Sequence, residues 1–374
     1  MIGAALCWAA PLLDLRPQMK GPSLMKTDIA IVGGGLTGLA LARRLDAANQ
    51  DYLLVEARNR LGGRIKSLNV QGQAFDLGPS WIWPGQERVF RILKELGLST
   101  FPQWSVGDQV YQHPNGDVVH AKGFMSMEGS FRIEGGTSAL VDALAAQTDT
   151  NRVLLNTQVT SVSQKHGIIL AAERQIHAER VVITTPPRLA AELTFSPALP
   201  PDARSALSAI PTWMGAHAKF VAVYPEAFWR ADGLSGDASS RRGPMVEIHD
   251  ASPDGAAFGA LFGFIGLPAG RRNEIGVSDL TAACIDQLAQ LFGQSANSPV
   301  HVALEDWSLA PLTATKADAH MPAGHPHYSK PKTIEGVWDG HLVFAGTELA
   351  PDNGGLIEGA LAAAEAAATE LLGN

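Results

Sequence analysis

The sequence predicts an α/β protein whose two parts interleave along the chain. Near the N-terminus, a short β-rich apolar run (28–32) precedes a glycine-rich turn and a stretch with helical spacing of its apolar residues (36–48). A second apolar run (52–56) follows at once. The alternation returns at the C-terminus, where a strand-like segment (340–346) precedes a long alanine-rich helix (355–372). The stretches between have a different texture, so we expect a second domain to be inserted there.

Shorter elements are expected in the middle of the chain. Three runs should form strands of a small meander: 153–162, 167–172 and 175–184. A further strand and a further helix are predicted at 217–224 and 280–292. The proline-rich stretch 186–201 is interpreted as a connection.

These elements define a discontinuous domain organisation. We assign the α/β domain to residues 26–80, 134–208 and 310–374. The second domain takes residues 81–133 and 209–309. Residues 1–25 are left as an N-terminal extension.

Composition and charge restrict the partners. The formal net charge of -8 over 374 residues argues against nucleic acid, which needs a concentrated basic surface. Two cysteines, Cys7 and Cys284, are too few for a disulfide framework and fit a reducing compartment. The apolar run 2–13 has no preceding basic residue and is too short to span a bilayer. We therefore expect a cytoplasmic protein without a membrane partner, with two alternatives for residues 1–24: a weak export signal, or an over-called start before Met25.

A glycine motif at 33–38 carries the strongest local signal. It has the GxGxxG form, follows a strand, opens a helix, and precedes Glu56 by the expected distance, 23 positions after Gly33. Gly33 permits the turn, Gly35 lets the backbone approach a pyrophosphate, and Gly38 allows close packing of helix and strand. The helix N-terminus offers free N–H groups, and Glu56 can bond a ribose diol. The predicted dinucleotide contacts are Gly33, Gly35, Leu36, Thr37, Gly38 and Glu56.

The segment 57–64 extends this site. It contains two glycines beside an arginine, which indicates a backbone close to phosphate with Arg64 in a charge-assisted contact. Ala57, Arg58 and Gly63 are added to the predicted contacts.

Together, GGGLTGLALARRL (33–45) and VEARNRLGGR (55–64) resemble the flavin-containing amine oxidase family, which includes monoamine oxidases, polyamine oxidases and flavin-type histone demethylases. VFAGTE (343–348) and NGGLIEGA (353–360) are similar to the family's second FAD segment. The resemblance implies a Rossmann-like FAD-binding domain with an interleaved α+β substrate domain, and FAD as the held cofactor.

The resemblance also implies further cofactor contacts. The glycine-rich turn and helix start near Gly355 would lie under the flavin ring, where a helix N-terminus stabilises negative charge on reduced flavin. Glu348 would bond the ribityl or phosphate region. The segment 76–81 is similar to the one that passes along the isoalloxazine, Val159 matches the position that holds the adenine end, and Thr184 belongs to a strand-end motif with Thr185 and Pro186. The contacts implied are Gly78, Pro79, Ser80, Trp81, Val159, Thr184, Gly346, Thr347, Glu348, Gly355, Leu356 and Ile357.

Lys219 is the catalytic candidate. Strand alternation places it on one face with His217, Val221 and Val223, where an unpaired charged amine would be costly to bury. The run KFVAVYPEAFW (219–229) resembles the family strand whose lysine holds a water near flavin N5. The alternative is a lysine whose stem packs while its amine reaches solvent.

The sequence departs from the family at the substrate site. Monoamine oxidases frame the amine with two aromatic rings, but Ala317 and Leu356 stand at those positions. Either this aromatic role is missing, or other residues such as Trp81, Trp83 or Phe264 supply it, which puts simple arylalkylamine substrates in doubt. Lys316 stands where some members attach FAD through cysteine, so we expect non-covalent FAD. The predicted substrate-pocket residues are Trp83, His217, Phe264, Ala317 and His320.

Three histidines at 320, 325 and 327 can be interpreted as a metal site, but we favour loop residues near the flavin edge or the substrate entrance, and we expect no metal.

The expected reaction transfers a hydride equivalent from the carbon alpha to an amine to flavin N5. An imine then hydrolyses to a carbonyl, and molecular oxygen is reduced to hydrogen peroxide. Two rivals stay open: an FAD-dependent dehydrogenase, desaturase or isomerase acting on a non-amine, favoured by the apolar run 258–267, and a non-catalytic flavin-fold module. The substrate, the electron acceptor and the oligomeric state are not determined by the sequence.

Overall fold

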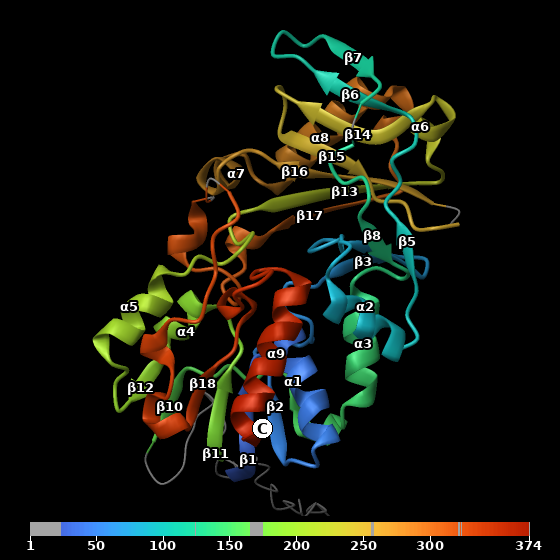
Figure 1. Ribbon diagram of the computed structural model, residues 1–374. Helices are drawn as coiled ribbons and strands as arrows, with labels where there is room; N and C mark the ends of the chain where they lie inside the picture. The colour runs from blue at the N-terminus through green and yellow to red at the C-terminus, as the bar shows by residue number, and fades with distance from the viewer. Residues whose placement is uncertain are drawn as a thin grey trace, which may run out of the picture.

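The computed structural model describes residues 24–123, 125–164, 175–255, 258–320, 322 and 324–373 (Figure 1). The expected strand at 167–172 and residues 1–23 of the extension lie outside these ranges. No helix within the described ranges is both long and apolar enough to cross a bilayer.

A five-stranded parallel sheet forms the first domain, in the order β18-β11-β1-β2-β9. Its strands are β1 (Leu24–Val32), β2 (Tyr52–Val55), β9 (Val153–Leu154), β11 (Gln175–Ile183) and β18 (Leu342–Phe344). β1 pairs with the strand that follows it, β2, on one side and with the distant β11 on the other. This reversal of strand order is the switch point beside which open α/β sheets bind ligands.

Helices cover both faces of this sheet because its strands are apolar on both sides. Ile29 and Ile31 of β1 pack against α1 (Leu36–Ala47), α3 (Ser138–Gln147) and α9 (Ile357–Leu372). Ala30 and Val32 of the same strand face α4 (Pro187–Glu192) and α5 (Pro201–Ala209). Helices α1 and α9, from opposite ends of the chain, lie side by side on the sheet (Figure 1).

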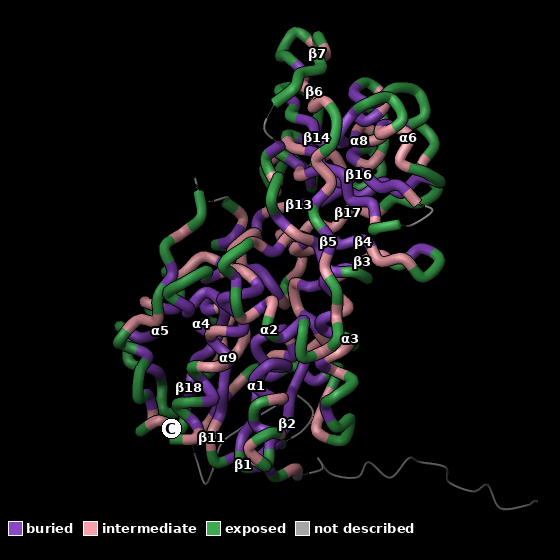
Figure 2. The backbone as a smooth tube through the Cα atoms, turned by 45° about the vertical axis from the view of Figure 1, so that its right-hand side comes forward, coloured by how far each residue is buried: buried purple, intermediate pink, exposed green. Residues whose placement is uncertain are grey.

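A seven-stranded sheet forms the second domain, in the order β17-β13-β16-β15-β14-β6-β7. The strands are β6 (Asp108–Gln112), β7 (Val118–Ala121), β13 (Ala218–Tyr224), β14 (Leu234–Ser240), β15 (Met245–Asp250), β16 (Gly259–Ile265) and β17 (His301–Asp306). All pairs are antiparallel except β14 with β6. Figure 2 shows that the interiors of both domains are buried, whereas the tip of the β6–β7 hairpin is exposed.

The side chains of strand β13 point alternately to the two faces of this second sheet. Phe220 and Tyr224 pack with α8 (Val277–Phe292), whereas Val221 and Val223 face the hairpin formed by β3 (Ser67–Val70) and β4 (Gln73–Asp76). Because side chains alternate along a strand, Lys219 lies on the same face as Val221 and Val223, as predicted from the sequence, and this is the face toward the hairpin. That face lies toward the parallel sheet, so β13 carries Lys219 to the junction of the two domains.

The remaining elements are short. The helices are α2 (Glu87–Glu95), α6 (Phe228–Ala231) and α7 (Ala269–Ile275), and the strands are β3 (Ser67–Val70), β4 (Gln73–Asp76), β5 (Thr100–Pro102), β8 (Phe131–Ile133), β10 (Ser161–Ser163) and β12 (Thr194–Ser196). Seven 3₁₀ turns are described: η1 (Thr150–Arg152), η2 (Gln294–Asn297), η3 (Trp307–Leu309), η4 (Lys316–Ala319), η5 (Lys332–Ile334), η6 (Val337–Gly340) and η7 (Thr347–Leu349).

The α/β fold class and the terminal elements are confirmed, but the middle region differs from the prediction. The meander is wrong, because β11 is a parallel strand between β1 and β18, and the run 153–162 divides into β9 and β10 in separate sheets. The stretch 186–201 is more than a connection: it contains α4 and β12 and reaches the first residue of α5, with prolines starting both helices. The domain boundaries themselves remain a prediction.

Candidate active site

A cavity of about 420 Å³ lies at the carboxyl ends of the parallel strands, against the β13 and β16 strands of the second sheet. Gly33 follows β1, Glu56 follows β2, and Thr184 follows β11, and all three line it. Gly355, Leu356 and Ile357, at the start of α9, line the same cavity. The two glycine turns therefore meet around one site, although more than 300 residues of sequence separate them.

The first turn is shaped to admit a ligand backbone. Gly33 has φ +114°, and a Cβ on Gly38 would lie 2.0 Å from the Gly33 carbonyl oxygen, so both positions require glycine. A Cβ on Gly35, in contrast, would meet nothing within 4 Å. Gly35 thus opens onto the cavity, while Gly38 packs beneath the turn and does not line it.

Glu56 is fixed at the cavity wall by the backbone around it. One carboxylate oxygen accepts from Gly34 N and the other from Arg58 N, each at 2.8 Å, and the residue is 4% exposed. A carboxylate oxygen has two lone pairs, so both oxygens can still accept from a diol. Burial lowers the pKa of the neighbouring Arg58, whose guanidinium donates to Thr313 Oγ1 (2.7 Å).

Arg64, which is partly exposed to the cavity, forms a bidentate ion pair with the buried Glu348. Glu348 is fully buried, also accepts from Trp213 N, and does not line the cavity, whereas Arg64 does. Burial alone would lower the pKa of Arg64, but the charge of Glu348 outweighs it and raises that pKa. Glu348 was expected to bond the ribityl or phosphate region, but its carboxylate accepts from the Arg64 guanidinium, whose charge neutralises the buried glutamate.

Lys219 lies at the cavity wall and is 3% exposed. Its Nζ donates to the Gly78 carbonyl oxygen (3.1 Å) and to Ser80 Oγ (2.7 Å), and lies 3.8 Å from the centroid of the Phe262 ring. The alternative of an amine that reaches solvent is wrong. Burial lowers the pKa of Lys219 from 10.5 to about 7, with a smaller opposing effect of Asp76. Near neutral pH the amine can therefore either donate or accept a hydrogen bond.

Aromatic and apolar side chains form much of the remaining wall. Trp81 packs against Phe262 and Phe264, with centroid distances of 5.2 and 6.3 Å. Further lining residues from outside the two glycine turns are Trp83, Gln86, Met127, Trp213, Met214, His217, Trp307, Leu312 and Thr313. Burial lowers the pKa of His217, which favours its neutral form.

Most of the predicted site residues line this cavity, but several do not. Among the cofactor contacts, Ala57, Val159 and Gly346 join Gly38 and Glu348 outside the lining. Val159 is a buried member of the core on the α4–α5 side of the sheet. Of the substrate residues, Ala317 and His320 are exposed in or after η4 and do not reach the cavity. Leu356 does line the cavity. Because neither Leu356 nor Ala317 is aromatic, neither of the two positions where monoamine oxidases carry rings provides one here.

The structure adds residues that sequence patterns did not reveal. Trp213 closes over the second glycine turn, because a Cβ on Gly355 (φ +82°) would lie 2.7 Å from the Trp213 Cβ. Its ring also packs against His325, with centroids 4.5 Å apart and planes tilted by 60°. Neither Trp213 nor Met127 belongs to a periodic segment, and only their positions in the fold identify them. Within the described ranges no group of three or more His, Cys, Asp or Glu side chains is arranged to hold a metal ion.

The cavity fits FAD by its open glycine cradle and by its unsatisfied polar atoms. Thr185 Oγ1 and His217 Nδ1 are buried and have no partner among the described side chains and backbone, although both residues line the cavity. Buried polar atoms are normally paired, so these two are available to a ligand. Cys284, the cysteine that the structure describes, is buried in α8 away from the cavity, in line with non-covalent FAD.

The fold and the site together define a two-domain flavoprotein with a dinucleotide cradle and a buried lysine. The chain belongs to the family described as flavin containing amine oxidoreductase, which it matches over residues 36–126 and 120–372. It is therefore an FAD-dependent oxidoreductase.

Curated relatives support this assignment at low identity. A probable flavin-containing monoamine oxidase A of Dictyostelium discoideum is 24% identical, covering 89% of this chain and 95% of that protein. A putative flavin-containing monoamine oxidase of Mycobacterium tuberculosis is 25% identical, with coverages of 92% and 96%. An L-amino acid dehydrogenase of Synechocystis is 23% identical, with coverages of 92% and 95%.

Solved structures support the fold. Wild-type putrescine oxidase bound to putrescine superposes with a TM-score of 0.79 at 21% identity, covering 94% of this chain and all of that chain. Cyclohexylamine oxidase from Brevibacterium oxydans gives 0.78 at 21% identity, with coverages of 92% and 99%.

Proposed function

We propose that this protein is an FAD-dependent oxidase of small-molecule amines. When bound, FAD would accept a hydride equivalent at N5 from the carbon alpha to the amine, and molecular oxygen would reoxidise it with formation of hydrogen peroxide. The imine product would hydrolyse to a carbonyl. The observation that carries the proposal is the buried Lys219, which shares an aromatic-walled cavity with both glycine turns.

The chain's own residues would bind, orient and protect. Gly35 and the N-terminus of α1 would receive the pyrophosphate, and Glu56 would accept from the ribose diol. Lys219 would hold a water at its wall of the cavity. The aromatic wall excludes bulk water, and this favours an amine that arrives neutral and keeps the imine from premature side reactions.

The test is anaerobic bleaching of the flavin. The purified protein should show the absorption spectrum of a flavin. Precipitation of the protein with acid should release the flavin into the supernatant, because the cofactor is held without a covalent bond. Cyclohexylamine, benzylamine, putrescine and L-leucine are then mixed with it in the absence of oxygen, and peroxide is measured on readmission of air. Bleaching by at least one amine with stoichiometric peroxide supports an amine oxidase. Failure of all amines to bleach a flavin that dithionite reduces would overturn it.

A second candidate is a dehydrogenase, desaturase or isomerase that acts on a non-amine. The observation that favours it is that neither position of the expected aromatic pair places a ring in the cavity wall. Leu356 lines the cavity but is aliphatic, and Ala317 does not line it. Polycyclic or isoprenoid substrates would then bleach the flavin where amines do not. An amine that bleaches a flavin slow to react with air but fast to react with a quinone would instead indicate an amine dehydrogenase. Bound FAD that no substrate bleaches would indicate a non-catalytic module.

The cellular location is proposed as cytoplasmic. The support is the low cysteine content, with two cysteines in the chain and the described one buried and free. Fractionation of cells followed by immunodetection tests this placement, and recovery of the protein outside the cytoplasm would refute it.

A further inference from the structure

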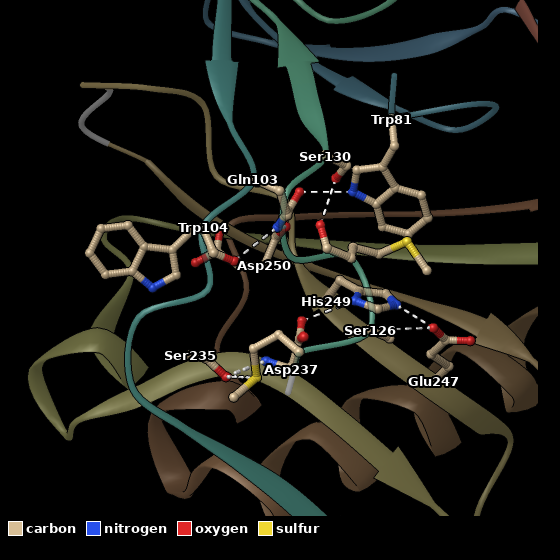
Figure 3. Close-up of polar contacts among 12 residues, drawn as sticks. Trp81, Gln103, Trp104, Ser126, Ser130, Ser235, Asp237, Glu247, His249 and Asp250 are labelled. Carbon is tan, nitrogen blue, oxygen red and sulfur yellow. Dashed lines mark hydrogen bonds and ion pairs between the residues drawn. The ribbon is translucent and has the colours of Figure 1, made fainter. Parts of the chain in front are cut away.

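His249 lies between two carboxylates behind the cavity wall (Figure 3). Its Nδ1 is 2.9 Å from Asp237 Oδ1 on β14, and its Nε2 is 2.9 Å from Glu247 Oε1 on its own strand, β15. The His249 side chain is 1% exposed, whereas the Glu247 side chain is 37% exposed. The cluster therefore runs from the interior of the second sheet to its surface.

The geometry favours a doubly protonated ring. A neutral imidazole has one N–H donor and one acceptor nitrogen, so a neutral His249 would leave a lone pair facing a carboxylate oxygen. Burial alone would lower the pKa of His249, but the hydrogen bonds and charges of Asp237 and Glu247 outweigh it and raise that pKa. The hydrogen bond from His249 in turn lowers the pKa of Glu247. The cluster is thus an ionic unit with two charge-assisted hydrogen bonds.

One side of the cluster contacts the cavity wall directly. The His249 ring packs edge-on against Trp81, with centroids 4.9 Å apart and planes at 82°. The indole N–H of Trp81 donates to Gln103 Oε1 (2.9 Å), and Gln103 donates to the Asp250 carbonyl oxygen (2.9 Å) beside His249 (Figure 3). The orientation of Trp81 therefore depends on the end of β15 at two points.

The other side of the cluster holds the turn at 125–130. Ser126 Oγ donates to Glu247 Oε1 (3.1 Å), which is the same oxygen that receives His249 Nε2. Met125 is 3% exposed and lies against Ser235 of β14, and Met127 lines the cavity. Consecutive residues thus anchor the turn in the sheet, attach it to the ionic unit and reach into the site.

We propose that Asp237, His249 and Glu247 form a clasp that holds the 125–130 turn and Trp81 in place, so that His249 is a positioning residue for the substrate side of the cavity. Its role in substrate positioning rests on the proposed function, but its structural role does not. Trp81 and Met127 come from segments far apart in sequence, and the clasp joins their supports. Loss of the clasp should widen this part of the cavity and weaken the binding of small substrates.

Two substitutions of His249 each remove one of its two hydrogen bonds and keep the other. The amide nitrogen of glutamine can replace Nε2, so His249→Gln retains the bond to Glu247. The amide nitrogen of asparagine can replace Nδ1, so His249→Asn retains only the bond to Asp237. Ser126→Ala removes the attachment of the turn without altering any buried charge. His301→Gln, at an exposed position of β17, is the matched control for the loss of an imidazole.

Backbone amide hydrogen exchange of the FAD-loaded protein tests the clasp without any substrate. Because one lost hydrogen bond contributes roughly 1 kcal/mol, backbone amides of 125–130 should exchange about 3- to 10-fold faster in Ser126→Ala and His249→Asn. His249→Gln and His301→Gln should stay within about twofold of the parent. Unchanged exchange in Ser126→Ala would overturn the clasp, and so would equal acceleration by the two His249 variants. If His249→Asn does not fold, the Ser126→Ala result decides alone.

Flavin bleaching then tests the effect on substrate. With cyclohexylamine as the probe, Ser126→Ala should raise the apparent dissociation constant several-fold while the limiting bleaching rate stays within about twofold. A fall in the limiting rate with an unchanged dissociation constant would contradict a positioning role. If no amine bleaches the parent protein, the proposed function fails, yet the exchange result still supports or overturns the clasp.

Discussion

Replacement of Lys219 by methionine should make the protein's stability less dependent on pH above neutrality. The folded state lowers the pKa of Lys219 from 10.5 to about 7 by burial. Between these two values the unfolded chain binds more protons than the folded chain, so the contribution of Lys219 to stability rises with pH across that window. The cost to folding stability of burying Lys219 is fully present below pH 7, and it is nearly gone at pH 10.5.

The size of the effect follows from the shift. A difference of about 3.5 pKa units corresponds to roughly 5 kcal/mol, and about 3 to 4 kcal/mol of it is recovered between pH 7 and pH 10. For a chain of 374 residues this is about 4 °C in Tm. The hydrogen bonds that Lys219→Met loses to Gly78 and Ser80 shift the Tm of the variant by an amount nearly independent of pH.

The assay is thermal unfolding of parent and variant at a fixed excess of FAD, followed by tryptophan fluorescence at several pH values from 7 to 10. The Tm of the parent should rise relative to the variant by about 4 °C across this range. Lys66→Met, at a partly exposed lysine that pairs with Glu305, is the control and should show a much smaller relative change. A parallel pH dependence of parent and Lys219→Met would refute the depressed pKa.

Three further predictions concern the cofactor cradle and its support. Glu56→Gln keeps the volume of the side chain but weakens its bonds to Gly34 N, Arg58 N and a ribose diol, so the Kd for FAD should rise about 10- to 100-fold in a fluorescence-quenching titration; an unchanged Kd would remove Glu56 from the site. Gly355→Ala places a Cβ against Trp213 at a positive φ and should lower the Tm of the FAD-free protein by several degrees, whereas Gly35→Ala meets open space and should leave that Tm unchanged while weakening FAD binding; equal Tm losses would contradict this account. Arg64→Met leaves Glu348 buried without its partner and should destabilise the protein by about 3 to 5 kcal/mol, and the double variant Arg64→Met with Glu348→Leu should recover much of that loss; a double variant no more stable than the single one would show that the charge is not the cause.

The sequence predicted those parts of the site that depend on local backbone chemistry. The turn at 33–38 and the start of α9 have fixed spacing between their glycines and the adjacent strand or helix, and both line the cavity. Lys219 was placed correctly because alternation along β13 alone determines which face it occupies. Each of these features needs only a few neighbouring residues.

Features that depend on distant contacts were missed or misplaced. Strand β11 was expected in a meander, since its apolar run does not reveal that its neighbours are β1 and β18. Glu348 was assigned to the cofactor because its local motif does not show Arg64, 284 positions away, as its partner. The clasp at His249 joins Asp237, Glu247 and Ser126 across three segments, and no periodic pattern connects them.

The arrangement of the parallel sheet has a consequence for the order of assembly during synthesis. The first glycine turn leaves the ribosome well before β11 and β18, which complete the sheet on its other side, and α9 follows β18. Trp213 also has nothing to close against until Gly355 has been made. Nascent chains that lack α9 should therefore fail to retain flavin, and cofactor loading should follow the synthesis of this helix.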